Sequence, residues 1–237
     1  MESTRYQTVI FDLDGTLLNT LDDLASSTNH ALAQFGLPSR TTDEVRAFVG
    51  NGIANLIRQA VPEGSDEKLM RDVHDAFDKH YAAHDLDATA PYPGVCELVT
   101  ELREAGMACC VVSNKGDYAV QPLVRHFFPG LFDVVCGERE REGIRRKPWP
   151  DTVLECMRAC DCAPEQCVYV GDSEVDVLTA RNARIDCITV TWGFRTPEQL
   201  VEAGALVMVD TVEQLEHVLL NDALHCGGSC DLGTAEE

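Results

Sequence analysis

Five short apolar runs constrain the fold of this 237-residue chain more than any other feature. Each run is rich in β-branched residues and is apolar almost throughout, without alternation of polar and apolar positions. This pattern is typical of parallel strands that helices cover on both faces. The runs are Thr8–Asp12, Ala108–Ser113, Cys167–Gly171, Asp186–Thr191 and Ala205–Val209.

Helical patterns follow several of these runs and lie between the later ones. We expect helices over Gly94–Ala105, Asp117–Phe127, Pro150–Ala159, Val175–Ala183 and Thr196–Ala203. A repeated order of strand, helix and strand is typical of a doubly wound sheet with helices on both faces. The sequence therefore predicts an α/β fold with a doubly wound, parallel-sheet (Rossmann-like) core.

The stretch after the first strand breaks this rhythm, because its patterns are helical. A first helix, starting at Leu21, is expected to end at Gly36. Thr41 and Glu44 form a capping-box pattern for a second helix, and Asp66–Ala83 predicts another. A Pro- and Gly-rich return linker follows over residues 89–94. We expect residues 19–88 to form an all-helical cap, inserted into a discontinuous core of residues 1–18 and 89–237.

The charge balance limits the partners of this chain. It has 40 Asp and Glu against 19 Lys and Arg, a formal net charge of −21. Nucleic acids recruit basic surfaces, so no nucleic-acid partner is expected. No apolar stretch is long enough for a transmembrane helix, and no secretory signal is visible. We expect a cytoplasmic monomer or homodimer that does not bind membranes.

The 11 cysteines are scattered through the sequence and are expected to be reduced thiols. Residues 225–237 are expected to be a flexible tail. His225, Cys226 and Cys230 in this tail lack the paired spacing of a zinc site, and their role stays open.

Two carboxylates follow the first predicted strand. Asp12 and Asp14 are two residues apart, so in an extended chain their side chains point the same way. Such a pair suits a nucleophile beside a proton donor, or a site for a hard metal ion. The plainer alternative is an acidic turn after a strand.

Further polar residues stand at the ends of other predicted elements. Asp172 follows the strand Cys167–Gly171, and Asp176 lies one helical turn later. These acids would reach the same sheet edge as Asp12, where Mg²⁺ needs oxygen ligands. The plainer alternative is an acidic helix N-terminus, which the helix dipole favours.

Ser113, Asn114 and Lys147 could hold a phosphate group. Ser113 and Asn114 end the strand that starts at Ala108, and Pro148 fixes Lys147 in a loop before a helix. A lysine there would offset the acids and bind phosphate oxygens. The alternative for Lys147 is an ordinary solvated charge.

In this order and at these positions, the four segments resemble the haloacid dehalogenase superfamily. Within it, the chain is similar to the phosphoglycolate phosphatase group. The further segments that carry this resemblance are Leu21-Asp22-Asp23-Leu24, Phe35-Gly36-Leu37-Pro38, Val49-Gly50-Asn51-Gly52, Pro93-Gly94-Val95, Ser113-Asn114-Lys115 and Lys147-Pro148. The resemblance covers nearly the whole chain, including the helical cap.

The resemblance implies a magnesium-dependent phosphatase that hydrolyses a small phosphorylated metabolite, 2-phosphoglycolate, through an aspartyl-phosphate intermediate. Asp12 would attack phosphorus, and Asp14 would protonate the leaving oxygen and then activate water. Ser113, Asn114 and Lys147 would bind the phosphoryl group.

The resemblance also implies the ligands of one Mg²⁺ ion. They are the Asp12 carboxylate, the main-chain carbonyl of Asp14 and the Asp172 carboxylate, with Asp176 supporting from nearby. Relatives often have other residues at Glu174-Val175 and at Arg184. These differences weaken the inference that this chain has the same substrate as its relatives.

The cap is expected to set the substrate. The amides of Gly50, Asn51 and Gly52, at the start of a helix, could meet a substrate carboxylate, and Arg46 could assist. An exposed helix arginine is the alternative for Arg46. An inorganic pyrophosphatase, a sugar-phosphate phosphatase and a phosphosugar mutase all remain open. A non-catalytic binding relative is disfavoured because every motif acid is present, and a true dehalogenase because Asp14 and Asp172 are present.

Overall fold

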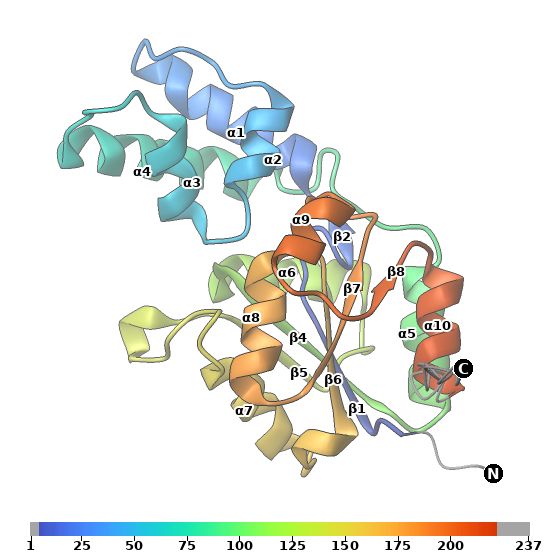
Figure 1. The fold of residues 1–237 in the computed structure, drawn as a ribbon. Coiled ribbons are helices and arrows are strands. Elements are labelled where there is room, and N and C mark those ends of the chain that lie inside the picture. The colour runs from blue at the N-terminus through green and yellow to red at the C-terminus, as the bar shows by residue number, and fades with distance from the viewer. Residues whose placement is uncertain (1–4, 222–237) are drawn as a thin grey trace, which may run out of the picture.

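A six-stranded sheet forms the centre of the computed structural model, which describes residues 5–221 (Figure 1). The strands lie in the order β5-β4-β1-β6-β7-β8, and every neighbouring pair is parallel. Their bounds are β1 Thr8–Phe11, β4 Ala108–Gly116, β5 Val134–Glu138, β6 Cys167–Gly171, β7 Asp186–Val190 and β8 Met208–Val209. The predicted parallel α/β core is confirmed.

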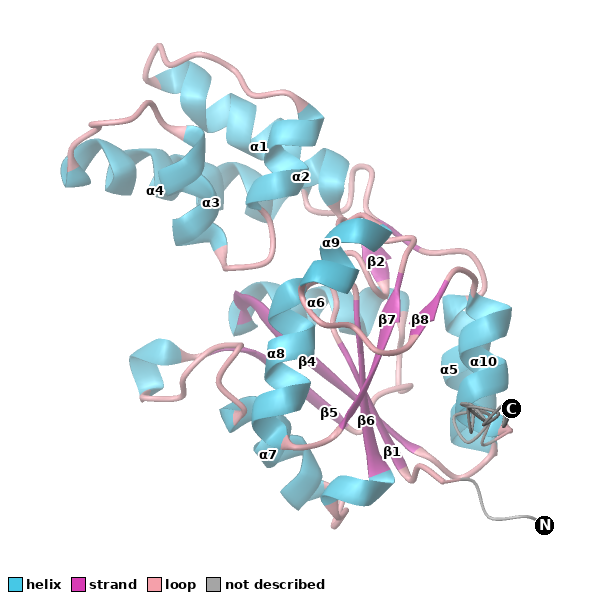
Figure 2. Ribbon diagram, viewed as in Figure 1, coloured by secondary structure: helices cyan, strands magenta, loops and turns pink. Residues whose placement is uncertain are grey.

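Helices cover both faces of this sheet (Figure 2). One face packs against α5 (Val95–Glu104), α6 (Asp117–Phe127) and α10 (Val212–Leu220), and the other against α7 (Asp151–Ala159) and α8 (Glu174–Ala183). Successive strand residues point to opposite faces. In β1, for example, Val9 and Phe11 enter the first cluster and Ile10 enters the second. This double burial explains why the strand sequences are continuously apolar.

The sequence did not predict β5 or α10, and it made β8 too long. The apolar run of β5 is only Val134–Cys136, and this strand lies at the sheet edge. Helix α9 (Pro197–Glu202) matches its predicted region. Two short 3₁₀ turns, η1 (Glu140–Glu142) and η2 (Pro164–Gln166), complete the core.

Four helices form a separate layer beyond the carboxyl ends of the strands (Figure 1). They are α1 (Leu21–Gln34), α2 (Thr42–Phe48), α3 (Ile53–Ala60) and α4 (Glu67–His84), and they share their own apolar cluster. The predicted capping box opens α2: the Thr41 hydroxyl accepts from the Glu44 amide at 3.2 Å, and Glu44 accepts from the Thr41 amide at 2.8 Å.

A two-stranded antiparallel ribbon joins this helical layer to the core. It pairs β2 (Leu18–Asn19) with β3 (Ala90–Pro91), so the predicted return linker contains a short strand. The buried Asp23 carboxylate fixes the chain just before β3, because it accepts hydrogen bonds from the amides of Ala88 and Thr89. The ribbon therefore gives the connection between the helical layer and the core an ordered structure.

Within residues 5–221, no helix combines the length and apolar character that crossing a bilayer requires. The predicted tail over residues 225–237, with His225, Cys226 and Cys230, lies outside the described residues.

Candidate active site

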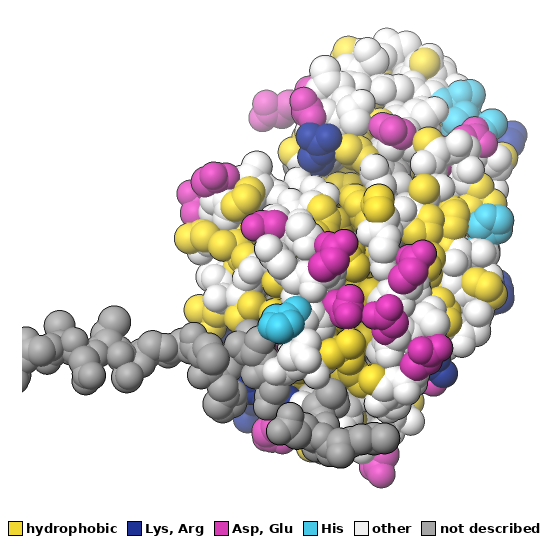
Figure 3. Space-filling view, turned by 90° about the vertical axis from the view of Figure 1, so that its right-hand side faces the viewer, with side chains coloured by type: hydrophobic (Ala, Val, Ile, Leu, Met, Phe, Trp, Pro, Cys, Tyr) yellow, Lys and Arg dark blue, Asp and Glu magenta, His cyan; other side chains and the backbone are white. Residues whose placement is uncertain are grey.

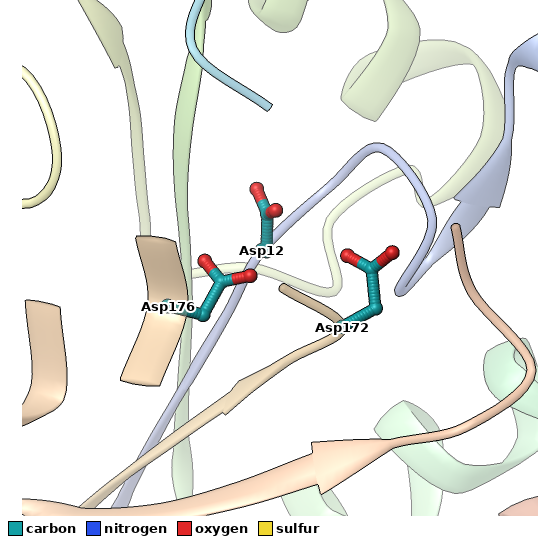
Figure 4. A group of neighbouring side chains, drawn as sticks. All are labelled: Asp12, Asp172 and Asp176. Carbon is teal, nitrogen blue, oxygen red and sulfur yellow. The ribbon is translucent and has the colours of Figure 1, made fainter. Parts of the chain in front are cut away.

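Three buried carboxylates meet at the carboxyl edge of the sheet (Figure 4). Asp12 follows β1, Asp172 follows β6, and Asp176 lies in the first turn of α8. Strands β1 and β6 pair in register, and the Asp12 amide donates to the Val170 carbonyl at 2.9 Å. This pairing places the two following acids side by side. One carboxylate oxygen of each acid lies within 4.8 Å of the others.

The Lys147 ammonium lies among these acids. Its Nζ is 2.9 Å from Asp12 Oδ1 and 2.7 Å from Asp176 Oδ1, and it donates to the Tyr169 hydroxyl at 3.1 Å. The lysine is almost fully buried, and its carbonyl accepts from Asn114 Nδ2 at 3.1 Å. It is therefore held in place and is not a solvated surface charge.

The charges of this group do not balance. Burial raises the pKa of Asp12 well above its ordinary value, and the Asp176 charge adds to the effect. Burial and the Asp176 charge also raise the pKa of Asp172, to about 7. Burial alone would favour a neutral amine at Lys147, yet the charges of Asp12 and Asp176 raise its pKa. Three acids share one ammonium, so an additional cation would relieve the repulsion.

The acids differ in how much of their hydrogen-bonding capacity is used. Asp176 Oδ1 contacts Lys147, while its Oδ2 accepts from the hydroxyl and amide of Ser173 at 2.6 and 3.1 Å. Asp172 Oδ2 accepts from the Phe194 amide at 2.6 Å. A side chain at Gly15, which has φ 90°, would collide with Asp172. Asp12 and Asp172 therefore present oxygens to the site, and Asp176 braces Lys147 and the start of α8.

The Asp14 carboxylate has different partners. Its Oδ1 lies 2.9 Å from Lys115 Nζ and accepts from the Thr20 hydroxyl at 2.7 Å. Lys115 Nζ also lies 4.7 Å from the centre of the Tyr81 ring, on α4 of the cap. A core lysine and a residue beside the ribbon thus fix Asp14.

A cavity of about 30 Å³ lies between the cap and the sheet edge. The core supplies its polar wall, and the cap supplies apolar side chains and glycine backbone. It is lined by Asp12, Asp14, Leu24, Val49, Gly50, Gly52, Ile53, Leu56, Ser113, Asn114, Lys115 and Lys147. Most of the predicted chemical and cap residues therefore line one space between the cap and the core.

Arg46 and Asn51 are not among the residues that line this cavity. The Arg46 guanidinium lies 2.6 Å from Asp43, one turn earlier on α2, and lines a separate groove with Tyr92 and Trp192. In this arrangement Arg46 does not reach the cavity, and its approach to the substrate stays a prediction. An ion pair within the helix holds its side chain instead.

The predicted phosphate-binding residue Asn114 has a structural use that the sequence did not indicate. Its Nδ2 donates to the Gly50 carbonyl of the cap at 3.0 Å as well as to Lys147. Ser113 accepts from the Lys115 amide at 3.2 Å. The contact between Asn114 and Gly50 places the cap loop over the strand that carries Ser113.

The sequence also did not predict that the core loop between β7 and α9 binds the cap. Arg195 donates to the carbonyls of Val49 and Arg46 at 2.8 and 3.2 Å, and Glu174 pairs with Arg195 at 2.8 Å. Phe194 packs into the apolar cluster of the cap. Relatives often have another residue at the position of Glu174, and this difference was the sequence signal that could have indicated its contact with Arg195.

Known proteins resemble this chain in sequence and in structure. A phosphoglycolate phosphatase of Haemophilus influenzae is 31% identical over 225 residues, covering 92% of this chain and 100% of that protein. A crystal structure from Lactobacillus delbrueckii subsp. bulgaricus, provisionally assigned as a phosphoglycolate phosphatase, has a TM-score of 0.86 at 38% identity and covers 92% of this chain and 99% of its own. CbbY from Rhodobacter sphaeroides, solved with phosphate, has a TM-score of 0.71 at 25% identity and covers 87% and 94%.

The family model described as haloacid dehalogenase-like hydrolase matches residues 9–190, from the first core strand to the end of β7. This range contains all the acids and lysines of the site. The chain therefore belongs to the haloacid dehalogenase-like hydrolase family.

Proposed function

We propose that this protein is a magnesium-dependent phosphatase that hydrolyses 2-phosphoglycolate through an aspartyl-phosphate on Asp12. The observation that carries the proposal is the cavity between cap and core in which Asp12, Asp14 and Lys147 meet. Phosphoglycolate phosphatases among its relatives support the reaction class.

Asp12 suits the role of nucleophile. Its Oδ1 is held by Lys147 and by the Leu13 amide, at 2.9 and 2.7 Å, which leaves Oδ2 to attack phosphorus. The bond to the leaving oxygen breaks as the new P–O bond forms. Lys147 and the Ser113 hydroxyl would bind the phosphoryl oxygens, on which the negative charge is spread during transfer.

Asp14 suits the role of acid and base. It would donate a proton to the leaving alkoxide and then take a proton from the water that hydrolyses the aspartyl-phosphate. The contacts with Lys115 and Thr20 hold its carboxylate in one position. A single acid can serve both steps because the second restores the proton given up in the first.

The surplus of negative charge fits a divalent cation. Asp12 and Asp172 would hold Mg²⁺ together with the main-chain carbonyl of Asp14, and Asp176 would support from beside Lys147. When bound, the ion would neutralise charge on the transferring phosphoryl group.

The cap residues Leu24 and Leu56 line the cavity together with Asp12, which favours a small substrate beneath the cap. The amides of Gly50 and Gly52, which line the cavity at the start of α3, are the groups proposed to meet the carboxylate of phosphoglycolate. Leu24 and Leu56 would exclude water around it.

The test is a phosphate-release assay with Mg²⁺ across phosphoglycolate, pyrophosphate and sugar phosphates. We expect phosphoglycolate to have the highest kcat/KM. Asp12→Asn should keep the fold but lose nearly all turnover, and only the wild-type protein should retain ³²P after acid quenching. Preference for pyrophosphate or a sugar phosphate would overturn the substrate assignment, while retained activity of Asp12→Asn would overturn the mechanism.

A further inference from the structure

Two cysteines at the end of the sheet opposite the active site lie unusually close together. The Sγ atoms of Cys162 and Cys167 are 3.0 Å apart. Cys162 lies in the turn between α7 and η2, and Cys167 is the first residue of β6. A disulfide bond is about 2.05 Å long, so the two sulfurs need to approach by only about 1 Å to bond.

The connection between the two cysteines is short and ordered. The Cys162 amide donates to the Met157 carbonyl at 3.0 Å, and the Gln166 amide donates to the Ala163 carbonyl at 3.0 Å. Pairing of Cys167 with Thr8 of β1 fixes the other end. The backbone therefore holds the two thiols together, without requiring a chance encounter of flexible segments.

The two thiols differ in access. Cys162 is half-buried and lines a surface groove with Arg158 and Asp161. Cys167 is fully buried, and burial together with the neighbouring Cys162 thiol raises its pKa. An oxidant from solution would therefore reach Cys162 first, and the buried Cys167 thiol would then react with the oxidised Cys162.

We propose that Cys162 and Cys167 form a redox-active dithiol, which a hydroperoxide converts into an intramolecular disulfide. In the first step the Cys162 sulfur attacks the peroxide, so that its thiol becomes a sulfenic acid and the hydroperoxide is reduced to an alcohol, or to water from hydrogen peroxide. In the second step the Cys167 sulfur attacks the Cys162 sulfur. The S–S bond forms, and the sulfenic oxygen leaves as water with the Cys167 proton.

Proximity makes the second step feasible despite the poor ionisation of Cys167. Well-oriented groups in one molecule react as if at effective concentrations of about 10⁵ M or more. This gain offsets the small thiolate fraction that a raised pKa imposes. The phosphatase site is not part of this chemistry, because Cys167 opens β6 whereas Asp172 follows its far end.

A second pair of thiols in the same region provides an internal comparison. Cys110 Sγ lies 3.6 Å from Cys160 Sγ, but Cys110 is buried within β4. Its larger separation predicts slower closure after oxidation of the half-buried Cys160. The linkage should therefore form first between Cys162 and Cys167.

The experiment treats the folded, full-length protein with hydrogen peroxide, blocks the remaining thiols with N-ethylmaleimide under denaturing conditions, and maps peptides by mass spectrometry. A background variant with Cys226→Ser and Cys230→Ser removes competing thiols. We expect loss of two alkylatable thiols, a linked peptide joining Cys162 to Cys167, and recovery of both thiols with dithiothreitol.

Two single variants complete the design. Cys162→Ser should abolish the linked peptide, whereas Cys96→Ser, which removes a thiol beside the Phe127 carbonyl, should leave it unchanged. Alkylation of both Cys162 and Cys167 after oxidation would overturn the proposal, as would a first linkage between Cys110 and Cys160. Accumulation of a stable sulfinic acid at Cys162 would also contradict the proposal, because it would show that Cys167 does not attack the sulfenic acid before further oxidation.

Discussion

The proton affinity of Asp172 follows from its burial, and it should be visible in the stability of the metal-free protein. Its pKa is raised to about 7 in the folded protein, against about 3.9 in an unfolded chain. The folded state therefore binds this proton more tightly. The resulting stabilisation is full below pH of about 3.9 and is lost as pH rises through about 7.

We expect the free energy of unfolding of chelator-treated protein to fall between about pH 5 and about pH 8 more steeply than that of Asp172→Asn. Urea titrations at several pH values measure both. The variant is the control, because it removes the Asp172 charge together with the part of the raised Asp12 pKa that this charge causes. Equal slopes would mean that Asp172 titrates normally.

Lys115 is a second residue whose surroundings suggest a measurable role. It is buried between Asp14 and the Tyr81 ring. Without this cation, Asp14 would lose the partner that orients it. We expect Lys115→Met to reduce turnover of phosphoglycolate, whose alkoxide leaving group needs a proton, on the order of a hundredfold.

The same variant should affect p-nitrophenyl phosphate much less, because nitrophenolate leaves without protonation. Steady-state kinetics on the two substrates gives this ratio, and Lys115→Arg tests whether charge alone restores it. Equal losses on both substrates would assign Lys115 to phosphate binding or folding.

At the scale of elements, the loop between β7 and α9 connects the cap to the acids of the site. The Phe194 amide donates to Asp172, and the Phe194 ring packs in the cap. Arg195 donates to the carbonyls of Arg46 and Val49 at the C-terminal end of α2. A guanidinium suits this position because the C-terminus of a helix carries partial negative charge.

We expect Arg195→Ala to weaken the docked cap by at least about tenfold, since hydrogen bonds to charged groups contribute about 1.5–3 kcal/mol each. Cleavage by a protease at the ribbon should accelerate, and KM for phosphoglycolate should rise. Arg145→Ala is the matched control, because Arg145 pairs with Asp151 within the core. Similar effects of the two variants would exclude a specific contribution of Arg195 to docking of the cap.

The sequence predicted strands well where burial on both faces makes the run continuously apolar. The observed bounds of β6, for example, are those that were predicted. It missed β5, whose apolar run is short, and the pairing of the ribbon, whose strands lie far apart in sequence. The acids and Lys147 could be predicted because strand ends converge. The ion pair of Arg46 with Asp43 could not be predicted, because it depends on side-chain conformations that a helical pattern does not reveal.

At the scale of the whole molecule, the net charge of −21 should oppose an anionic substrate. Acidic side chains gather over part of the face shown in Figure 3. Screening shortens the reach of this field, from about 30 Å at 0.01 M salt to about 8 Å at 0.15 M.

We therefore expect kcat/KM for phosphoglycolate to rise several-fold over this range of ionic strength. Stopped-time assays with saturating Mg²⁺ measure the change, and sucrose of matched osmolarity serves as the uncharged control. A fall with added salt would show that Lys115 and Lys147 dominate the field that the substrate meets.

The ribbon of β2 and β3 has a consequence for engineering. The cap enters and leaves the core through two adjacent strands, so both ends of any exchanged segment meet at one place. A chimaera that joins a foreign helical cap after Asn19 and before Ala90 would keep Asp12, Asp14, Lys147 and Asp172 on their own elements. Phe194 would then be the side chain to redesign, because it alone of the core's buried apolar residues packs within the helical layer among residues 5–221. Substrate range would thereby become a transplantable property, separable from the chemistry beneath it.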